Sequence, residues 1–280
     1  MKIGLSLGSG GARGYAHIGV IRALEEAGVK PDLINGSSIG AIVGGAYALY
    51  LDAKRIADLV QELTSRMKVN YFNIFNHAQP KRPFLRDWLF EALCDITALR
   101  GSVLSHRTNR SALSYLFGEY RFSDTVIPFS AVAVDLLSGE TVVIKDGRLR
   151  DGILPSISIP GIFPPVEYKG MLLTDGGVLA DVPVWELRAE GADFIIAVDL
   201  LDDPPDQHRN GFDLLTIVDY LKGERLARWE TEAADFLIKI ELPGYNPLQF
   251  GNYREAIEKG YETAKRALPA LLRKLERNGS

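Results

Sequence analysis

The sequence is poor in residues on which several protein classes depend. Its 280 residues include a single cysteine, Cys94, which excludes an internal disulfide and fits a reducing compartment. Cys94 falls in an apolar helical pattern, so we interpret it as a buried core residue rather than a reactive thiol. Without a disulfide, stability depends on a hydrophobic core. With 46% hydrophobic residues, the chain can bury the core of one large domain or of two small ones.

Long apolar runs and basic patches are also missing. No run reaches the roughly 18 residues that a membrane-spanning helix needs, and Met1–Leu7 is too short for a signal peptide. The formal net charge of −4 and the lack of a basic stripe with interleaved aromatics argue against a nucleic-acid partner. We therefore expect a cytoplasmic protein, for which peripheral contact with a membrane surface remains open.

Hydrophobic spacing divides the first fifty residues into two strand–loop–helix units. A strand at Ile3–Leu7 leads through the glycine-rich loop Gly8–Gly14 to a helix over Tyr15–Ala27. A second strand near Asp32–Asn35 leads to a helix from Ile39 to about Leu51. Two consecutive units of this kind indicate a parallel sheet covered by helices.

Further elements are expected along the rest of the chain. We interpret residues from about 53 to 125, which carry no strand pattern, as a helical insertion, and residues from about 206 to 280 as a C-terminal extension. Both join a motif-bearing core, 3–200, in a single domain of residues 1–280. The expected helices are Ala53–Met67, Phe84–Leu99, Asn109–Phe117, a helix start at Pro183–Glu190, Phe212–Thr231 and Arg254–Lys274, and the expected strands are Phe129–Asp135, Glu140–Lys145, Met171–Thr174, Phe194–Asp199 and Phe236–Ile240.

A Gly-x-Ser-x-Gly pattern lies at the second strand-to-helix junction. Gly36, Ser38 and Gly40 have the spacing of a nucleophile elbow, in which a sharp turn projects the serine hydroxyl above the sheet. The flanking glycines suit a chain that passes too close to itself for a Cβ atom. Taken alone, the stretch fits equally well a glycine-flanked serine that caps a helix.

Three glycine-rich pieces each follow an expected strand: Gly8–Gly14, Gly36–Gly40 and Asp175–Gly177. Since loops that follow parallel strands lie at one edge of a sheet, we expect the three to converge. Together they would supply a serine, a carboxylate and a backbone loop able to bind an anion. A nucleotide site is disfavoured, because Arg13 stands where the third glycine of Gly-x-Gly-x-x-Gly belongs and no acidic residue ends the second strand.

The sequence offers few histidines to activate Ser38. In the chain order of α/β-hydrolases, only His208 follows Asp175, and it lies in a polar loop. His17 falls on the first helix, while His77 and His106 fall in the middle segment. A carboxylate acting directly on Ser38 is therefore favoured, provided that it lies within hydrogen-bond reach in a partly dry site.

Four motifs occur in a recognisable order. Gly10-Gly11-Ala12-Arg13-Gly14, Gly36-Ser37-Ser38-Ile39-Gly40, Ser158-Ile159-Pro160-Gly161 and Asp175-Gly176-Gly177 together resemble the patatin-like phospholipase family, especially its compact bacterial members. The resemblance covers roughly residues 3 to 200. It implies a three-layer α/β/α fold with a mostly parallel central sheet.

The same resemblance implies a Ser–Asp dyad and lipid acyl hydrolysis without a cofactor or a metal. Ser38 would be the nucleophile and Asp175 the base. The loop formed by Gly10, Gly11, Ala12 and Arg13 would be the oxyanion hole, Gly36 and Gly40 would shape the elbow, and Gly176 and Gly177 would complete the acid motif. The partner would be a phospholipid, a lysophospholipid or another lipid ester.

The sequence departs from the family pattern at two places. Many plant members carry three consecutive glycines in the first loop, where this chain has Ser9, and two asparagines after Asp-Gly-Gly, where it has Asp181 and Val182. The second departure prevents the transfer of plant substrate preferences. A nucleotide-binding α/β protein and a non-catalytic regulator that binds a partner remain as alternatives.

Overall fold

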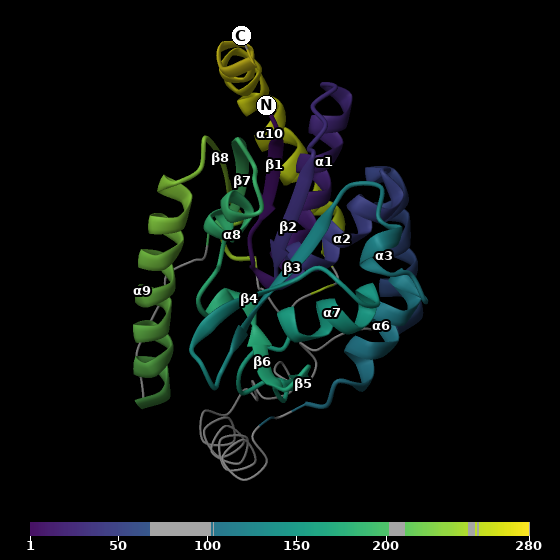
Figure 1. The fold of residues 1–280 in the computed structure, drawn as a ribbon, viewed down its shortest axis with the longest axis vertical. Helices are drawn as coiled ribbons and strands as arrows, with labels where there is room; N and C mark the ends of the chain where they lie inside the picture. Colours follow the sequence, from purple (N-terminus) through teal and green to yellow (C-terminus); the bar gives the residue numbers. More distant parts are fainter. Residues whose placement is uncertain (68–101, 103, 202–210, 246–249, 251, 280) are drawn as a thin grey trace.

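A computed structural model describes residues 1–67, 102, 104–201, 211–245, 250 and 252–279. Its centre is a mixed, mostly parallel sheet with helices on both faces (Figure 1), which confirms the expected fold class. The parallel part has the order β3-β2-β1-β7-β8, and three strands pair antiparallel at the β3 end. The strands are β1 (Ile3–Leu7), β2 (Leu33–Ser37), β3 (Phe129–Asp135), β4 (Glu140–Ile144), β5 (Val166–Tyr168), β6 (Met171–Asp175), β7 (Phe194–Leu201) and β8 (Phe236–Glu241).

Helices cover the two faces of the sheet unequally. In the described part of the chain, six helices pack over the larger hydrophobic core on one face of the sheet, and two lie on the other face. The six helices on the first face are α1 (Tyr15–Glu26), α2 (Ile39–Tyr50), α3 (Ala53–Met67), α6 (Arg107–Phe117), α7 (Leu149–Ser156) and α10 (Tyr253–Gly279). The two helices on the other face are α8 (Val184–Ala189) and α9 (Gly211–Glu232). The described residues also form the short 3₁₀ turns η1 (Gly11–Gly14), η2 (Phe122–Asp124) and η3 (Gly176–Val178).

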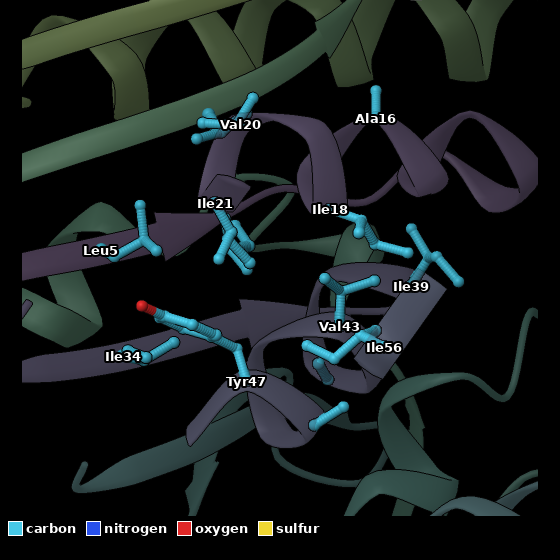
Figure 2. Packing of buried hydrophobic residues seen from close by; sticks show 14 of the residues in the cluster. Leu5, Ala16, Ile18, Val20, Ile21, Ile34, Ile39, Val43, Tyr47 and Ile56 are labelled. Carbon is cyan, nitrogen blue, oxygen red and sulfur yellow. The ribbon is translucent and has the colours of Figure 1, made fainter. Parts of the chain in front are cut away.

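Strand β7 shows why the sheet is buried on both faces. Its residues alternate between the two cores, with Phe194 and Ile196 in the larger one and Ile195 and Ala197 in the smaller. An unbroken apolar run is typical of a parallel strand covered on both sides by helices. Figure 2 shows the larger core between α1 and α2, where their apolar side chains meet above β1 and β2.

The long helix α10 lies against α1 at very short range. A Cβ atom on Gly260 would come within 2.0 Å of the Ala16 carbonyl oxygen, and one on Gly19 within 1.9 Å of the Ile257 carbonyl oxygen. These two glycines therefore let the helix backbones touch. Through α10 and β8, residues of the C-terminal extension enter the larger core and extend the sheet.

Most expected elements are confirmed, with boundaries shifted by a few residues. Two elements escaped prediction: β5, which has only three residues, and α7, which contains Gly152 and Pro155. The expected helix Phe84–Leu99, with Cys94 in it, and the histidines His77 and His208 lie outside the described residues. Within the described ranges, no helix has the length and apolar character needed to cross a bilayer.

Candidate active site

The turn between β2 and α2 holds Ser38 in an unusual backbone conformation. Ser38 has φ 53° and ψ −122°, a region that costs a non-glycine residue about 1–3 kcal/mol. The two flanking glycines are required by close approach, because a Cβ on Gly36 would lie 2.3 Å from the Gly40 backbone, and one on Gly40 would lie 2.2 Å from the Leu7 carbonyl oxygen. This geometry is that of a nucleophile elbow, and the Ser38 side chain forms no capping hydrogen bond to α2.

Ser156, at the end of α7, fixes the elbow to the sheet. Its hydroxyl accepts a 3.0 Å hydrogen bond from the Ser38 amide and donates a 2.5 Å hydrogen bond to the Val132 carbonyl on β3. Ser156 is fully buried. No sequence pattern predicts this contact, because Ser156 is 118 residues from Ser38 in the chain.

Asp175 reaches Ser38 by a route that differs from the expected one. We expected the Asp175 loop to follow a parallel strand, but β6 runs antiparallel to β3, so that reason is wrong. Strand β4 pairs with residues 131–135 of β3, and β2 and β6 therefore share the opposite edge of β3. They run toward each other and end at adjacent β3 positions, Ser37 beside Val132 and Asp175 beside Ala133.

The meeting of these two strands brings a hydroxyl and a carboxyl group into contact. The Ser38 hydroxyl donates a 2.7 Å hydrogen bond to Oδ2 of Asp175, and the Gly177 amide donates a 2.9 Å hydrogen bond to Oδ1. Gly176 is required here, because a Cβ on it would lie 2.4 Å from the Val132 carbonyl oxygen.

The Asp175 carboxyl group is tuned by its surroundings. Its residue is 5% exposed, and burial raises the pKa of this carboxyl to about 7. The hydrogen bonds from Ser38 and Gly177 lower it, whereas the nearby Asp181 raises it further. A pKa near neutrality suits a general base, because the ionised form is then present while the proton affinity remains useful.

The first glycine loop lies beside the elbow and forms a tight turn. Gly10 and Gly11 adopt φ of 137° and 57°, which favour glycine. Within the part of the chain that the structure describes, the amides of Gly10, Gly11 and Ala12 donate no hydrogen bond, as befits the start of η1. The Arg13 amide differs, since it donates to the Gly10 carbonyl at 3.2 Å.

The Arg13 side chain is buried in the structure and holds the loop to later parts of the chain. Its guanidinium donates to the Tyr245 carbonyl at 3.1 Å and to the Leu201 carbonyl at 3.3 Å. Of the four residues expected in the oxyanion hole, Gly10, Gly11 and Ala12 thus have amides available to an anion. The Arg13 amide is already hydrogen-bonded to the Gly10 carbonyl, and the Arg13 side chain anchors the loop.

The two departures from the family pattern lie against each other. The Ser9 hydroxyl donates a short hydrogen bond to the Asp181 carboxylate, and the Ser9 amide donates to the Asp181 carbonyl at 2.9 Å. Burial raises the pKa of Asp181, and the Ser9 hydrogen bond lowers it. This pair connects the glycine loop to the segment that follows the Asp175 motif.

The described histidines do not hydrogen-bond to Ser38 or Asp175. His17 Nε2 donates to the Gly8 carbonyl at 2.8 Å, and burial lowers the pKa of its imidazole to about 4, which keeps the ring neutral. His106 Nε2 donates to the Pro164 carbonyl at 2.8 Å. In the described ranges, no three His, Cys, Asp or Glu side chains are arranged to hold a metal ion.

An apolar pocket lies beside Ser38 on the α2 side of the sheet. It has a volume of about 130 Å³ and includes Ser38 and Gly11 in its wall. Tyr15 of α1 and Phe250 also line it. Most of the wall comes from α2, α3, α6 and the Ile157–Phe163 loop, with the side chains of Ile42, Leu63, Leu113, Ile159, Ile162 and Phe163. A hydrocarbon chain attached to a carbonyl near Ser38 would find an apolar surface there.

Comparison with known proteins identifies the family. A model of the patatin-like phospholipase family matches residues 5–188. The chain belongs to this family. The match includes the glycine loop, the elbow and the Asp175 motif, and it ends before β7, β8, α9 and α10.

Two relatives are similar to this chain over 199 residues. An uncharacterised NTE family protein of Mycobacterium tuberculosis is 38% identical over 199 residues, 71% of this chain and 49% of the relative. Lysophospholipase NTE1 of Saccharomyces cerevisiae is 34% identical over 199 residues, 71% of this chain and 11% of the yeast protein. This patatin-like chain thus spans about half the length of the mycobacterial relative.

A solved structure shares the fold. VipD from Legionella pneumophila has a TM-score of 0.54 at 16% identity, covering 96% of this chain and 67% of that chain. At this identity the likeness concerns the fold alone. It extends beyond residue 188, to the elements that follow the match with the family model.

Proposed function

We propose that the chain is a serine acyl hydrolase that cleaves acyl esters of phospholipids, lysophospholipids or related lipids with a Ser38–Asp175 dyad. The observation that carries this proposal is the 2.7 Å hydrogen bond between the Ser38 hydroxyl and the buried Asp175 carboxyl group. The elbow conformation of Ser38 and the name of the yeast relative, a lysophospholipase, support it.

The proposed reaction has two halves. Asp175 accepts the Ser38 proton as the serine oxygen attacks the ester carbonyl, and it then returns the proton to the leaving alcohol. In the second half, water attacks the carbonyl of the acyl-enzyme while Asp175 accepts a proton from it. Asp175 then returns this proton to the Ser38 oxygen as the acyl–oxygen bond breaks and the fatty acid leaves. The dyad needs no histidine because burial raises the pKa of the Asp175 carboxyl to about 7.

The developing oxyanion needs hydrogen-bond donors that are in place before the reaction. The amides of Gly10, Gly11 and Ala12 lie at the start of η1 and donate to no group in the described structure. In other hydrolases each such donor lowers the barrier by about 3 kcal/mol. The Ser9–Asp181 contact would hold this loop in place.

The proposal is tested with purified wild-type protein beside Ser38→Ala and Asp175→Asn. Release of fatty acid from phosphatidylcholine, lysophosphatidylcholine and a soluble short-chain ester is measured for each. Both variants should lose at least about a thousandfold in kcat/KM, as expected for removal of a nucleophile or its base. A fluorophosphonate probe should label wild type once, at Ser38.

Ser37→Ala provides a matched control. The Ser37 hydroxyl is buried beside the elbow and has no hydrogen-bond partner among the described residues, so its loss should leave folding and labelling intact. Turnover that survives in folded Ser38→Ala would exclude Ser38 as the nucleophile. Turnover that survives in Asp175→Asn would assign the base to another group.

We also propose that residues 1–280 act as one domain. The C-terminal helix α10 packs against α1, and β8 pairs with β7 over six residue positions. Leu268 and Leu271 of α10 are buried in the larger core. Removal of the C-terminal extension would expose this core, so the isolated core 3–200 should not fold.

A further inference from the structure

The outward face of α9 is apolar. Leu221 is 60% exposed and Trp229 57%, and Leu214 and Val218 on the same helix are also exposed. These side chains recur at intervals of three, four or eight residues, so they follow one side of the helix. Figure 1 shows α9 on the side of the sheet opposite α2, α3 and α6, at the edge of the molecule.

The apolar side of α9 is not covered by the body of the protein. A surface helix normally buries its apolar side, whereas α9 leaves Leu214, Val218, Leu221 and Trp229 exposed. Glu230, by contrast, is buried and accepts a 3.0 Å hydrogen bond from the Val182 amide, so it points toward the body.

Two cations accompany the apolar side chains on this outward face. Lys222 and Arg225 line a shallow depression together with Val218, Leu221 and Trp229. A helix with an apolar face that carries basic residues and tryptophan is suited to lie in the headgroup region of an anionic membrane. The stretch from Leu214 to Trp229 is about 22 Å long, enough to lie flat on such a surface.

A second tryptophan adds to the exposed apolar surface of α9. Trp185, at the start of α8, packs on Trp229 with ring centroids 5.2 Å apart, and it is exposed. Val178 and Leu179, which follow the Asp175–Gly177 motif directly in the chain, are exposed as well.

We propose that the outward face of α9, with Trp185, docks the protein on an anionic phospholipid surface. The location of the substrate in that surface rests on the proposed lipid hydrolase function, but the docking itself can be measured without turnover. A second copy of the chain is the competing occupant. Lys222 and Arg225 line the depression in the middle of the face and favour an anionic surface, whereas the exposed Glu232 at the end of the helix is the carboxylate that a second copy could pair with them.

The test is cosedimentation with vesicles of phosphatidylcholine alone and of phosphatidylcholine mixed with phosphatidylserine. Wild type should bind the mixed vesicles and bind pure phosphatidylcholine more weakly. Lys222→Gln/Arg225→Gln should lower the partition coefficient on mixed vesicles about 20-fold, since each basic side chain near such a surface is worth about fivefold. Val218→Ser/Leu221→Ser should lower binding to both kinds of vesicle.

Leu137→Ser provides the matched control, because Leu137 is 73% exposed on the β3–β4 turn, away from α9. It should bind as wild type does. Ser38→Ala should also bind unchanged, and the α9 variants should hydrolyse a soluble short-chain ester at the wild-type rate. These two results separate failure of docking from failure of the proposed catalysis.

Three outcomes would overturn the docking proposal. Wild type could fail to bind anionic vesicles, the α9 variants could bind as well as Leu137→Ser, or the free protein could be a dimer that the α9 substitutions dissociate. The last result would assign the face to self-association. It is measured by light scattering on the same preparations.

Discussion

The pH dependence of the reaction tests the physical state of Asp175 directly. The base must be ionised to accept the Ser38 proton, and burial raises the pKa of its carboxyl to about 7. Lowering the pH from 8 to 5 therefore protonates Asp175 while ordinary exposed carboxyl groups stay ionised. We expect kcat/KM to fall along a single acid limb with its midpoint near pH 7.

The size of the effect follows from the position of that pKa. With a pKa of about 7, roughly 10% of the carboxyl is ionised at pH 6 and roughly 1% at pH 5, so kcat/KM should fall about a hundredfold over the range. A carboxyl with the ordinary pKa of about 3.9 would still be about 90% ionised at pH 5 and would give almost no loss. The two cases differ by nearly two orders of magnitude.

The assay uses a soluble short-chain ester whose acid product is quantified by chromatography, so that the readout does not itself titrate. Three buried carboxyl groups with raised pKa values do not favour unfolding as the pH falls. Burial raises the pKa of Asp175 and Asp199 to about 7 and that of Glu230 to about 9. The folded state binds these protons more tightly than the unfolded state, so their contribution to stability falls as the pH rises from about 4 to 9.

Melting temperatures by circular dichroism at each pH provide the control. Activity should decline from pH 8 to 5 without any loss of melting temperature attributable to these three groups. An acid limb with its midpoint below pH 5 would refute the reasoning, because Asp175 would then have an ordinary pKa or would not be the base. A decline that follows the melting temperature would refute it as well.

Two further substitutions test contacts that support the site and the core. Ser9→Ala removes the hydroxyl that donates to the Asp181 carboxylate. The variant should lose about 1–3 kcal/mol of unfolding free energy, and its kcat should fall because the glycine loop is held less firmly. Unchanged denaturation and kinetics would contradict this role. Gly260→Ala would place a Cβ 2.0 Å from the Ala16 carbonyl oxygen, so it should destabilise by about 1–3 kcal/mol or more. Gly223→Ala is its control, since nothing lies within 4 Å of its Cβ and the helix should gain up to about 1 kcal/mol; equal melting temperatures for the two variants would contradict the close helix contact.

Local patterns in the sequence predicted the parts of the fold that depend on neighbouring residues. The two initial strand–loop–helix units and the elbow at Ser38 follow from hydrophobic spacing and glycine positions within a few residues. The parallel arrangement of β1 and β2 followed from the same units. Helix α7 was missed because Gly152 and Pro155 are poor helix formers, and tertiary packing over β3 outweighs that preference.

Contacts between distant segments could not be predicted in the same way. The antiparallel direction of β6, the bridge from Ser156 to Val132 and the pairing of Ser9 with Asp181 each join positions that are far apart in the chain. The shortage of histidines and the converging glycine-rich pieces favoured a carboxylate base for Ser38, and the resemblance to a family assigned that role to Asp175. Likewise, the spacing along α9 fits a helix, but only the structure shows which of its sides faces outward.

The approach of β2 and β6 along one edge of β3 has a consequence for how such proteins can diverge. The separation of Ser38 and Asp175 depends on the register of two strand pairs and on adjacent β3 residues, Val132 and Ala133. Sliding either strand by one residue would move its end by about 3.3 Å and turn its side chains to the other face. The stretch between α2 and β3 carries no such constraint, so it can lengthen, shorten or be replaced while the hydroxyl–carboxyl spacing is inherited unchanged.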